Sequence, residues 1–141
     1  MLTEKDYCDY DTCVALKELG YKVPTSAYYM PKNSQLIFVI NQFRGGAAMD
    51  CFYSNNSLHK ECMASDFIDA PTMWEAQKWL REEKGIHIEM DRMGYSTGYG
   101  WQVSIVEMEY NLCKSVIHNN NSYEEALSEG IKEAIKILKE K

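Results

Sequence analysis

The chain lacks a long apolar run. Its longest, Leu36–Ile40, has five residues, whereas a helix that crosses a bilayer needs about 20 consecutive apolar residues. Its first residues, MLTEKDYCDYD, are polar and acidic and show no charged-then-apolar secretory pattern. We therefore expect a soluble protein of the cytoplasm, where thiols stay reduced, and no contact with a membrane.

Positive charge is also in short supply. The 141 residues include 15 lysines and arginines against 21 aspartates and glutamates, which gives a net charge of −6 at pH 7. Nonspecific binding to a phosphate backbone depends on clustered cations, and the sequence contains no basic run. We therefore expect no nucleic-acid partner. An acidic decoy for a nucleic-acid-binding protein is one alternative function.

Cysteines at metal-binding spacing are missing as well. The five cysteines are odd in number and scattered, which is typical of buried thiols rather than of a disulfide framework. Structural zinc sites usually bring their ligands as two close pairs, whereas the alternative site here, Cys51, His59 and Cys62, contains only one. We therefore expect no metal and no cofactor. The same loop gives a second alternative function, a small thiol-dependent enzyme that uses a Cys–His pair.

Motifs of the common catalytic sites do not appear either. The chain has no nucleophile elbow, no dinucleotide-binding fingerprint and no HExxH motif. The glycine-rich segment 93–100 lacks the Gly-Lys-Ser/Thr ending of a phosphate-binding loop. These absences favour a protein that is not an enzyme, and no catalytic residue is assigned.

What the chain does contain is a set of well-marked helix ends. Helices are predicted at Thr12–Leu19, Thr72–Lys84 and Ser122–Leu138. Thr72 and Glu75 fit a capping box, in which each side chain accepts from the other residue's backbone amide, and Gly85 supplies the left-handed residue that ends this helix. On the same helix Trp79 falls on the apolar stripe, and Trp74 falls off it.

The strand signals are less regular. Strands are predicted at Ser26–Met30, Gln35–Phe43, Ile86–Asp91 and Trp101–Tyr110, with a short one at Cys51–Tyr53. Alternating apolar residues indicate that the third and fourth of these form a hairpin, and the adjacent Ile105 and Val106 predict a bulge there. Glu107 is expected on the outward side of its strand. Arg44–Asp66 has no sustained period and is predicted to be a long irregular connection.

Together these elements predict a single globular domain, residues 1–141, of the α+β class. Three helices are expected to pack on one antiparallel or mixed sheet of about four to five strands. The segments 15–23 and 79–88 are similar, and both have the order helix, glycine, strand. The similarity favours two helix–strand–strand units followed by the C-terminal helix.

Aromatic residues provide the candidate binding surface. Tyr95, Tyr99 and Trp101 lie in or beside the predicted hairpin loop, and aromatic side chains on loops often contact partners. The alternative is that they fold back and cover the sheet. Trp74 lies off the core stripe, near Arg81. We therefore predict that Trp74, Arg81, Tyr95, Tyr99 and Trp101 bind a partner, either another protein or a second copy of this chain.

Several motifs of the chain resemble one family. They are Ala70-Pro-Thr72, Lys78-Trp-Leu-Arg-Glu82 and Tyr123-Glu-Glu-Ala126. This pattern is similar to that of small proteins with no known activity that are encoded in gut bacterial genomes and in their phages or mobile elements. The resemblance spans most of the chain and consists of caps, glycine stops and core positions. It implies an accessory role and transfers no catalytic residue.

Overall fold

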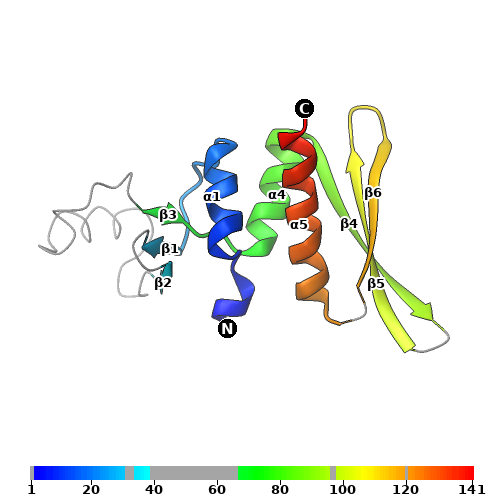
Figure 1. Ribbon diagram of the computed structural model, residues 1–141, viewed down its shortest axis with the longest axis horizontal. Coiled ribbons are helices and arrows are strands. Elements are labelled where there is room, and N and C mark those ends of the chain that lie inside the picture. Colours follow the sequence, from blue (N-terminus) through cyan, green and yellow to red (C-terminus); the bar gives the residue numbers. More distant parts are fainter. Residues whose placement is uncertain (1, 31–33, 39–66, 96–97, 120) are drawn as a thin grey trace, which may run out of the picture. The chain divides into compact units, whose positions relative to one another are not determined.

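The computed structural model describes residues 2–30, 34–38, 67–95, 98–119 and 121–141. Two compact units are present: the α4–α5 unit, residues 1–8 and 72–141, and the α1 unit, residues 9–71. The helices are the 3-10 turn η1 (Glu4–Asp6) and the α-helices α1 (Tyr10–Glu18), α4 (Met73–Lys84) and α5 (Tyr123–Lys139). The strands are β1 (Ala27–Met30), β2 (Gln35–Phe38), β3 (Ile68–Asp69), β4 (Ile86–Tyr95), β5 (Gly98–Glu107) and β6 (Leu112–Asn119) (Figure 1).

The predicted α+β class is confirmed, with three α-helices in the described residues. Each lies close to its predicted position. Within the residues that the structure describes, no helix has the length and apolar character needed to cross a membrane.

In the α4–α5 unit, two helices pack on one face of a three-stranded sheet. The strands are antiparallel in the order β4-β5-β6, and Figure 1 shows α4 and α5 side by side on the same face. The buried residues of that face alternate along β4 and β5: Ile86, Ile88, Val103 and Ile105. The buried helix residues include Leu80, Leu127 and Ile131. The core of this unit therefore lies between the helices and the sheet.

One glycine sets the distance between α5 and the sheet. A Cβ atom at Gly130 would lie 2.7 Å from Cγ1 of Val103 and 2.8 Å from Cγ2 of Ile88, well inside the roughly 3.5 to 4.0 Å of a good carbon–carbon contact. Gly130 is buried within α5, where glycine costs about 1 kcal/mol of helix propensity relative to alanine. The close contact between helix and sheet offsets that cost.

The helix ends form as the sequence predicts. The backbone amide of Glu75 donates to Oγ1 of Thr72 at 3.2 Å, and the amide of Thr72 donates to Oε1 of Glu75 at 2.9 Å. Gly85 ends α4 with a left-handed φ of 66°. The hydroxyl of Ser122 accepts from the amide of Glu125 at 3.1 Å and so caps α5. These local contacts satisfy amides that would otherwise have no partner at the helix starts.

The α1 unit contains α1 and a second three-stranded sheet, in the order β2-β1-β3. The predicted pairing of β1 with the following strand is confirmed. Tyr28 of β1 is buried with its ring edge-on to Phe67, at a centroid distance of 4.9 Å. Burial raises the pKa of Tyr28 to about 12. It also raises the pKa of Asp69 on β3, a rise that the charge of Lys17 opposes.

The prediction of one sheet is wrong. The described strands form two separate three-stranded antiparallel sheets. β3 and β6 escape the sequence patterns because β3 has two residues and β6 buries only its last residue, Asn119. The predicted strand at Cys51–Tyr53 and the connection Arg44–Asp66 lie outside the described residues.

The predicted hairpin is confirmed, but the bulge predicted beside Ile105 lies in a different strand pair. β4 pairs with β5 without interruption from Ile86 to Tyr95, so most of the glycine-rich segment is strand instead of loop. The register shift beside Ile105 belongs to the pairing of β5 with β6, where Lys114 is the extra residue. Because β5 keeps its alternation, Glu107 shares the helix-facing side with Ile86. Its predicted outward position is therefore wrong.

Gly130→Ala is expected to destabilise the fold, because the added methyl group overlaps Val103 and Ile88. The free energy of unfolding should fall by about 1 to 3 kcal/mol, the usual effect of overpacking a core. The matched control is Ser128→Ala at a half-buried position of the same helix, which should change it by less than about 0.5 kcal/mol. Urea unfolding measures both. A Gly130→Ala variant at least as stable as the parent would contradict the close contact.

Candidate binding surface

The β4–β5 hairpin continues past the end of the three-stranded sheet. Trp101 pairs with Asn119, the last residue of β6. Beyond this row, residues 98–100 of β5 pair only with residues 93–95 of β4. We call these two segments the arm, which lies at the lower right of Figure 1. Two-stranded ribbons are marginally stable in water, so the arm depends on its own side-chain contacts.

Tyr99 lies on the arm with 71% of its surface exposed. Its cross-strand partner is Gly94, and two ring atoms lie 3.8 and 3.9 Å from the position that a Cβ atom of Gly94 would take. The guanidinium carbon of Arg92 lies 4.7 Å from the ring centroid, a cation–π contact worth about 0.5 to 1 kcal/mol at an exposed site. The ring is therefore held across β4 while most of its surface stays open to solvent.

Trp101 covers the sheet instead. Its ring is edge-on to that of Tyr123, the first residue of α5, at a centroid distance of 4.9 Å. This contact joins the start of α5 to the sheet beside the arm. Of the two interpretations offered for the aromatic residues, covering of the sheet therefore applies to Trp101. Tyr99 is exposed instead. Tyr95 ends β4, and its side chain lies outside the described residues.

Trp74 and Arg81 lie on α4. Nε2 of Gln77 donates to the carbonyl of Ile88 at 2.8 Å, which sets the level of α4 along β4. Because α4 leads into β4 through a reversal, Trp74 lies about one turn nearer the arm than Gln77 and Arg81 about one turn farther away. Trp74 is 38% exposed, and Trp79 is buried as predicted. Trp74 therefore lies on the arm side of Gln77 along α4, and Arg81 lies on the opposite side.

A second exposed set lies on the β5–β6 turn and on β6. Its large apolar side chains are Met108, Tyr110, Leu112 and Val116. The sequence patterns miss this set because residues 101–110 are predicted as one strand and β6 is not predicted. The overlooked signal is Asn111, which has a φ of 49° in the turn. Asparagine is one of the few residues that adopt this left-handed conformation readily, so it marks a strand end.

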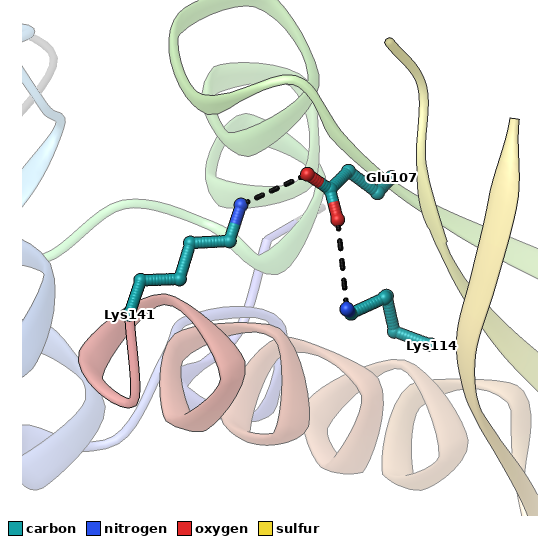
Figure 2. A network of polar contacts seen from close by, with 3 residues as sticks. All are labelled: Glu107, Lys114 and Lys141. Atoms are coloured by element: carbon teal, nitrogen blue, oxygen red, sulfur yellow. Dashed lines mark hydrogen bonds and ion pairs between the residues drawn. The ribbon is translucent and has the colours of Figure 1, made fainter. Parts of the chain in front are cut away.

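Glu107 forms a polar network near the same turn (Figure 2). Its Oε1 accepts from Nζ of Lys141 at 3.0 Å, and its Oε2 lies 3.7 Å from Nζ of Lys114. The hydrogen bond from Lys141 is the main cause that lowers the pKa of Glu107, and the charges of both lysines add to it. A carboxylate held ionised by two lysines is a poor general base at neutral pH. The network therefore connects β5 and β6 with Lys141, which follows the end of α5.

The described residues provide no metal centre. Within them, no group of three or more histidine, cysteine, aspartate or glutamate side chains is placed to hold an ion. The alternative site of Cys51, His59 and Cys62 lies outside the described residues. Cys8 and Cys13 are buried as predicted. Cys113 is exposed because it lies on an outer strand of the sheet. The prediction of buried thiols is therefore wrong for Cys113.

Comparison with known proteins gives no relative from which a role can be transferred. No family model, no curated protein and no solved structure matches this chain. The resemblance to small proteins of gut bacterial genomes stays a prediction. A function has to be inferred from the residues of the chain itself.

Glu107→Gln is expected to destabilise the fold in a pH-dependent way. Because pairing lowers the pKa of Glu107 from its usual 4.5, the ionised carboxylate stabilises the folded chain fully above that pH. The contribution is lost as the pH falls through the lowered value. The difference in urea midpoint between parent and variant should therefore be largest near neutral pH and shrink in acid.

The matched control for this prediction is Glu109→Gln, which removes the same charge from the exposed β5–β6 turn. Its urea midpoint should stay close to that of the parent at every pH, because exposed charges contribute little. A Glu107→Gln effect that is constant across the pH range would contradict the stabilising role of the network.

Proposed function

We propose that this chain is an accessory protein that binds another protein through the arm end of the α4–α5 unit. The observation that supports this most directly is the position of Tyr99. This residue is 71% exposed, and its ring contacts Arg92 and the backbone at Gly94 on a two-stranded arm. Tyrosine and arginine are enriched among the residues that dominate binding energy at protein interfaces.

The contacts of Tyr99 also reduce the cost of binding. A side chain that is free in solution loses rotamer freedom when a partner immobilises it, at about 0.5 to 1.5 kcal/mol. The Tyr99 ring is already restrained by its contacts with Arg92 and Gly94, so less freedom remains to be lost. The binding site is thus partly preorganised before the partner arrives.

The same contacts define the kind of partner that fits. The open surface of the Tyr99 ring suits an apolar pocket, because burying an aromatic ring removes a large apolar area from water. The planar guanidinium of Arg92 keeps donors that suit a carboxylate at the rim of such a pocket. Trp74, in the first turn of α4, offers additional apolar surface. The proposed partner is therefore a folded protein with an acidic rim around an apolar pocket.

The proposal includes a bacterial origin and a cytoplasmic location for this chain. The resemblance of the Ala70–Thr72, Lys78–Glu82 and Tyr123–Ala126 motifs to small proteins of gut bacteria supports an origin in a bacterial genome, a phage or a mobile element. We accordingly propose that the chain acts in the bacterial cytoplasm. The net charge of −6 gives the acidic-decoy alternative a distinct signature, since capture of a basic partner by long-range charge weakens strongly with salt.

Tyr99→Ala is expected to weaken partner binding by at least about tenfold, the usual loss at a central aromatic contact. The measurement is quantitative mass spectrometry of proteins retained from a gut bacterial lysate, followed by titration of the retained protein in purified form. Tyr110→Ala is the matched control, because this tyrosine is 68% exposed and lies on the β5–β6 turn, beyond the end of β5 that is opposite to the arm. It should bind like the parent.

Two results would count against the proposed surface. Equal retention by the parent and by Tyr99→Ala would place the binding site elsewhere. Retention that salt abolishes equally in both proteins would favour the acidic decoy. Thermal unfolding should show that Tyr99→Ala stays folded, since the residue is exposed.

A further inference from the structure

The outer edge of β4 is partly covered by α4. In antiparallel pairing, opposite residues alternate between pairs joined by two backbone hydrogen bonds and pairs joined by none. The amide of Met108 donates to the carbonyl of Gly85 at 2.9 Å, so this is a bonded row. The row Ile88–Ile105 lies an odd number of rows from the Gly85–Met108 row, so its two residues are not joined by backbone hydrogen bonds. The carbonyl of Ile88 therefore points away from β5, and Nε2 of Gln77 donates to it.

The same alternation determines which backbone groups of β6 face outward. It turns the backbone of Val103 toward β6 and makes Val103–Ile117 a bonded row. The N–H and C=O groups of residues 116 and 118 consequently point away from β5. β6 is the last strand of its sheet in the described part of the chain. Val116 is 49% exposed on this strand.

β6 also carries none of the chain's negative charge. The chain has 21 acidic residues, yet none lies in Leu112–Asn119. The one lysine of β6, Lys114, is at the bulge and is paired with Glu107. Edge strands usually avoid unwanted pairing through charges, proline or bulges, and segment 115–119 has none of these. The β6 strands of two copies can therefore approach without opposing carboxylates of their own, and the neighbouring carboxylate, Glu129 of α5, accepts from Nδ2 of Asn119 at 3.0 Å.

We propose that two copies of the chain pair along residues 115–119 of β6, in antiparallel orientation, about a two-fold axis at Ile117. Val116 of each copy then exchanges backbone hydrogen bonds with His118 of the other. The two Ile117 side chains meet on the helix-facing side, in the same row as Val103. The β4-β5-β6 sheets of the two copies then form one continuous sheet. This pairing uses a different surface from the arm and does not depend on the proposed function.

The self-complementarity of the segment favours a second copy over another protein. In this register Ser115 faces Asn119 and Val116 faces His118, so no carboxylate and no lysine is opposed. The apolar row that contains Ile117 and Val103 continues into the second copy. An extended segment of another protein would satisfy the backbone groups of β6 but would leave the isolated chain monomeric.

Sedimentation equilibrium of the full chain tests the proposal and should show a monomer–dimer equilibrium. Val116→Pro removes an N–H that points away from β5, so the sheet within each copy keeps its own hydrogen bonds. Each dimer loses the bonds that Val116 donates, and we expect a dissociation constant at least about tenfold higher. Val116→Thr is the matched control, since it keeps the N–H and the strand propensity. It should dimerise like the parent.

Cross-linking tests the register without relying on the proline variant. In a Cys113→Ser background, Ile117→Cys places two thiols on an unbonded antiparallel row, where Cα atoms lie about 4.5 Å apart and within reach of a disulfide. Mass spectrometry should identify that disulfide under mild oxidation. Val116→Cys in the same background faces His118 and should not link. A chain that is monomeric at every concentration, a dimer that Val116→Pro leaves unchanged, or linkage through Val116→Cys instead would overturn the proposal.

Discussion

The close packing of α5 on the sheet at Gly130 is the constraint on which the rest of the α4–α5 unit depends. With no side chain at that position, the helix backbone lies directly on Val103 and Ile88. Two further contacts hold the ends of the helix: the Trp101–Tyr123 ring pair at its start and the Lys141–Glu107 bond just after its end. A helix fixed at its start, middle and end leaves the sheet little freedom to shift beneath it. The sheet that carries the arm and the β6 edge is therefore held against α5 at three points.

The helices were predictable because their ends depend on residues only a few positions apart. Thr72, Glu75 and Gly85 specify the limits of α4 through contacts that would form in almost any surroundings. Strand β6, which forms one edge of its sheet, was not predictable in this way. Lys114 becomes the extra residue of a bulge only when β6 pairs with β5, and the sequence alone does not state that pairing. The sequence pattern therefore located the slip beside Ile105 correctly but assigned it to the wrong strand.

The candidate surface shows the same division between local and distant causes. Exposure of Trp74 follows from its place on the helical wheel and could be predicted. The different roles of Tyr99 and Trp101 could not, because they depend on where α5 begins relative to the sheet, and only Trp101 meets Tyr123. An outward-facing edge is likewise a property of strand order, so no pattern within β6 reveals it.

The hydrogen bond from Gln77 to Ile88 makes the two outer edges of the sheet unequal, because it occupies a carbonyl at the β4 edge. A sheet that is open on both sides can add chains at each end without limit, which is the geometry of a fibre. Here Gln77 of the same chain already donates to the carbonyl of Ile88 at the β4 edge, so that carbonyl is taken before a further chain could pair there. A fibre built through the β4 edge would therefore have to displace an amide side chain of the same molecule.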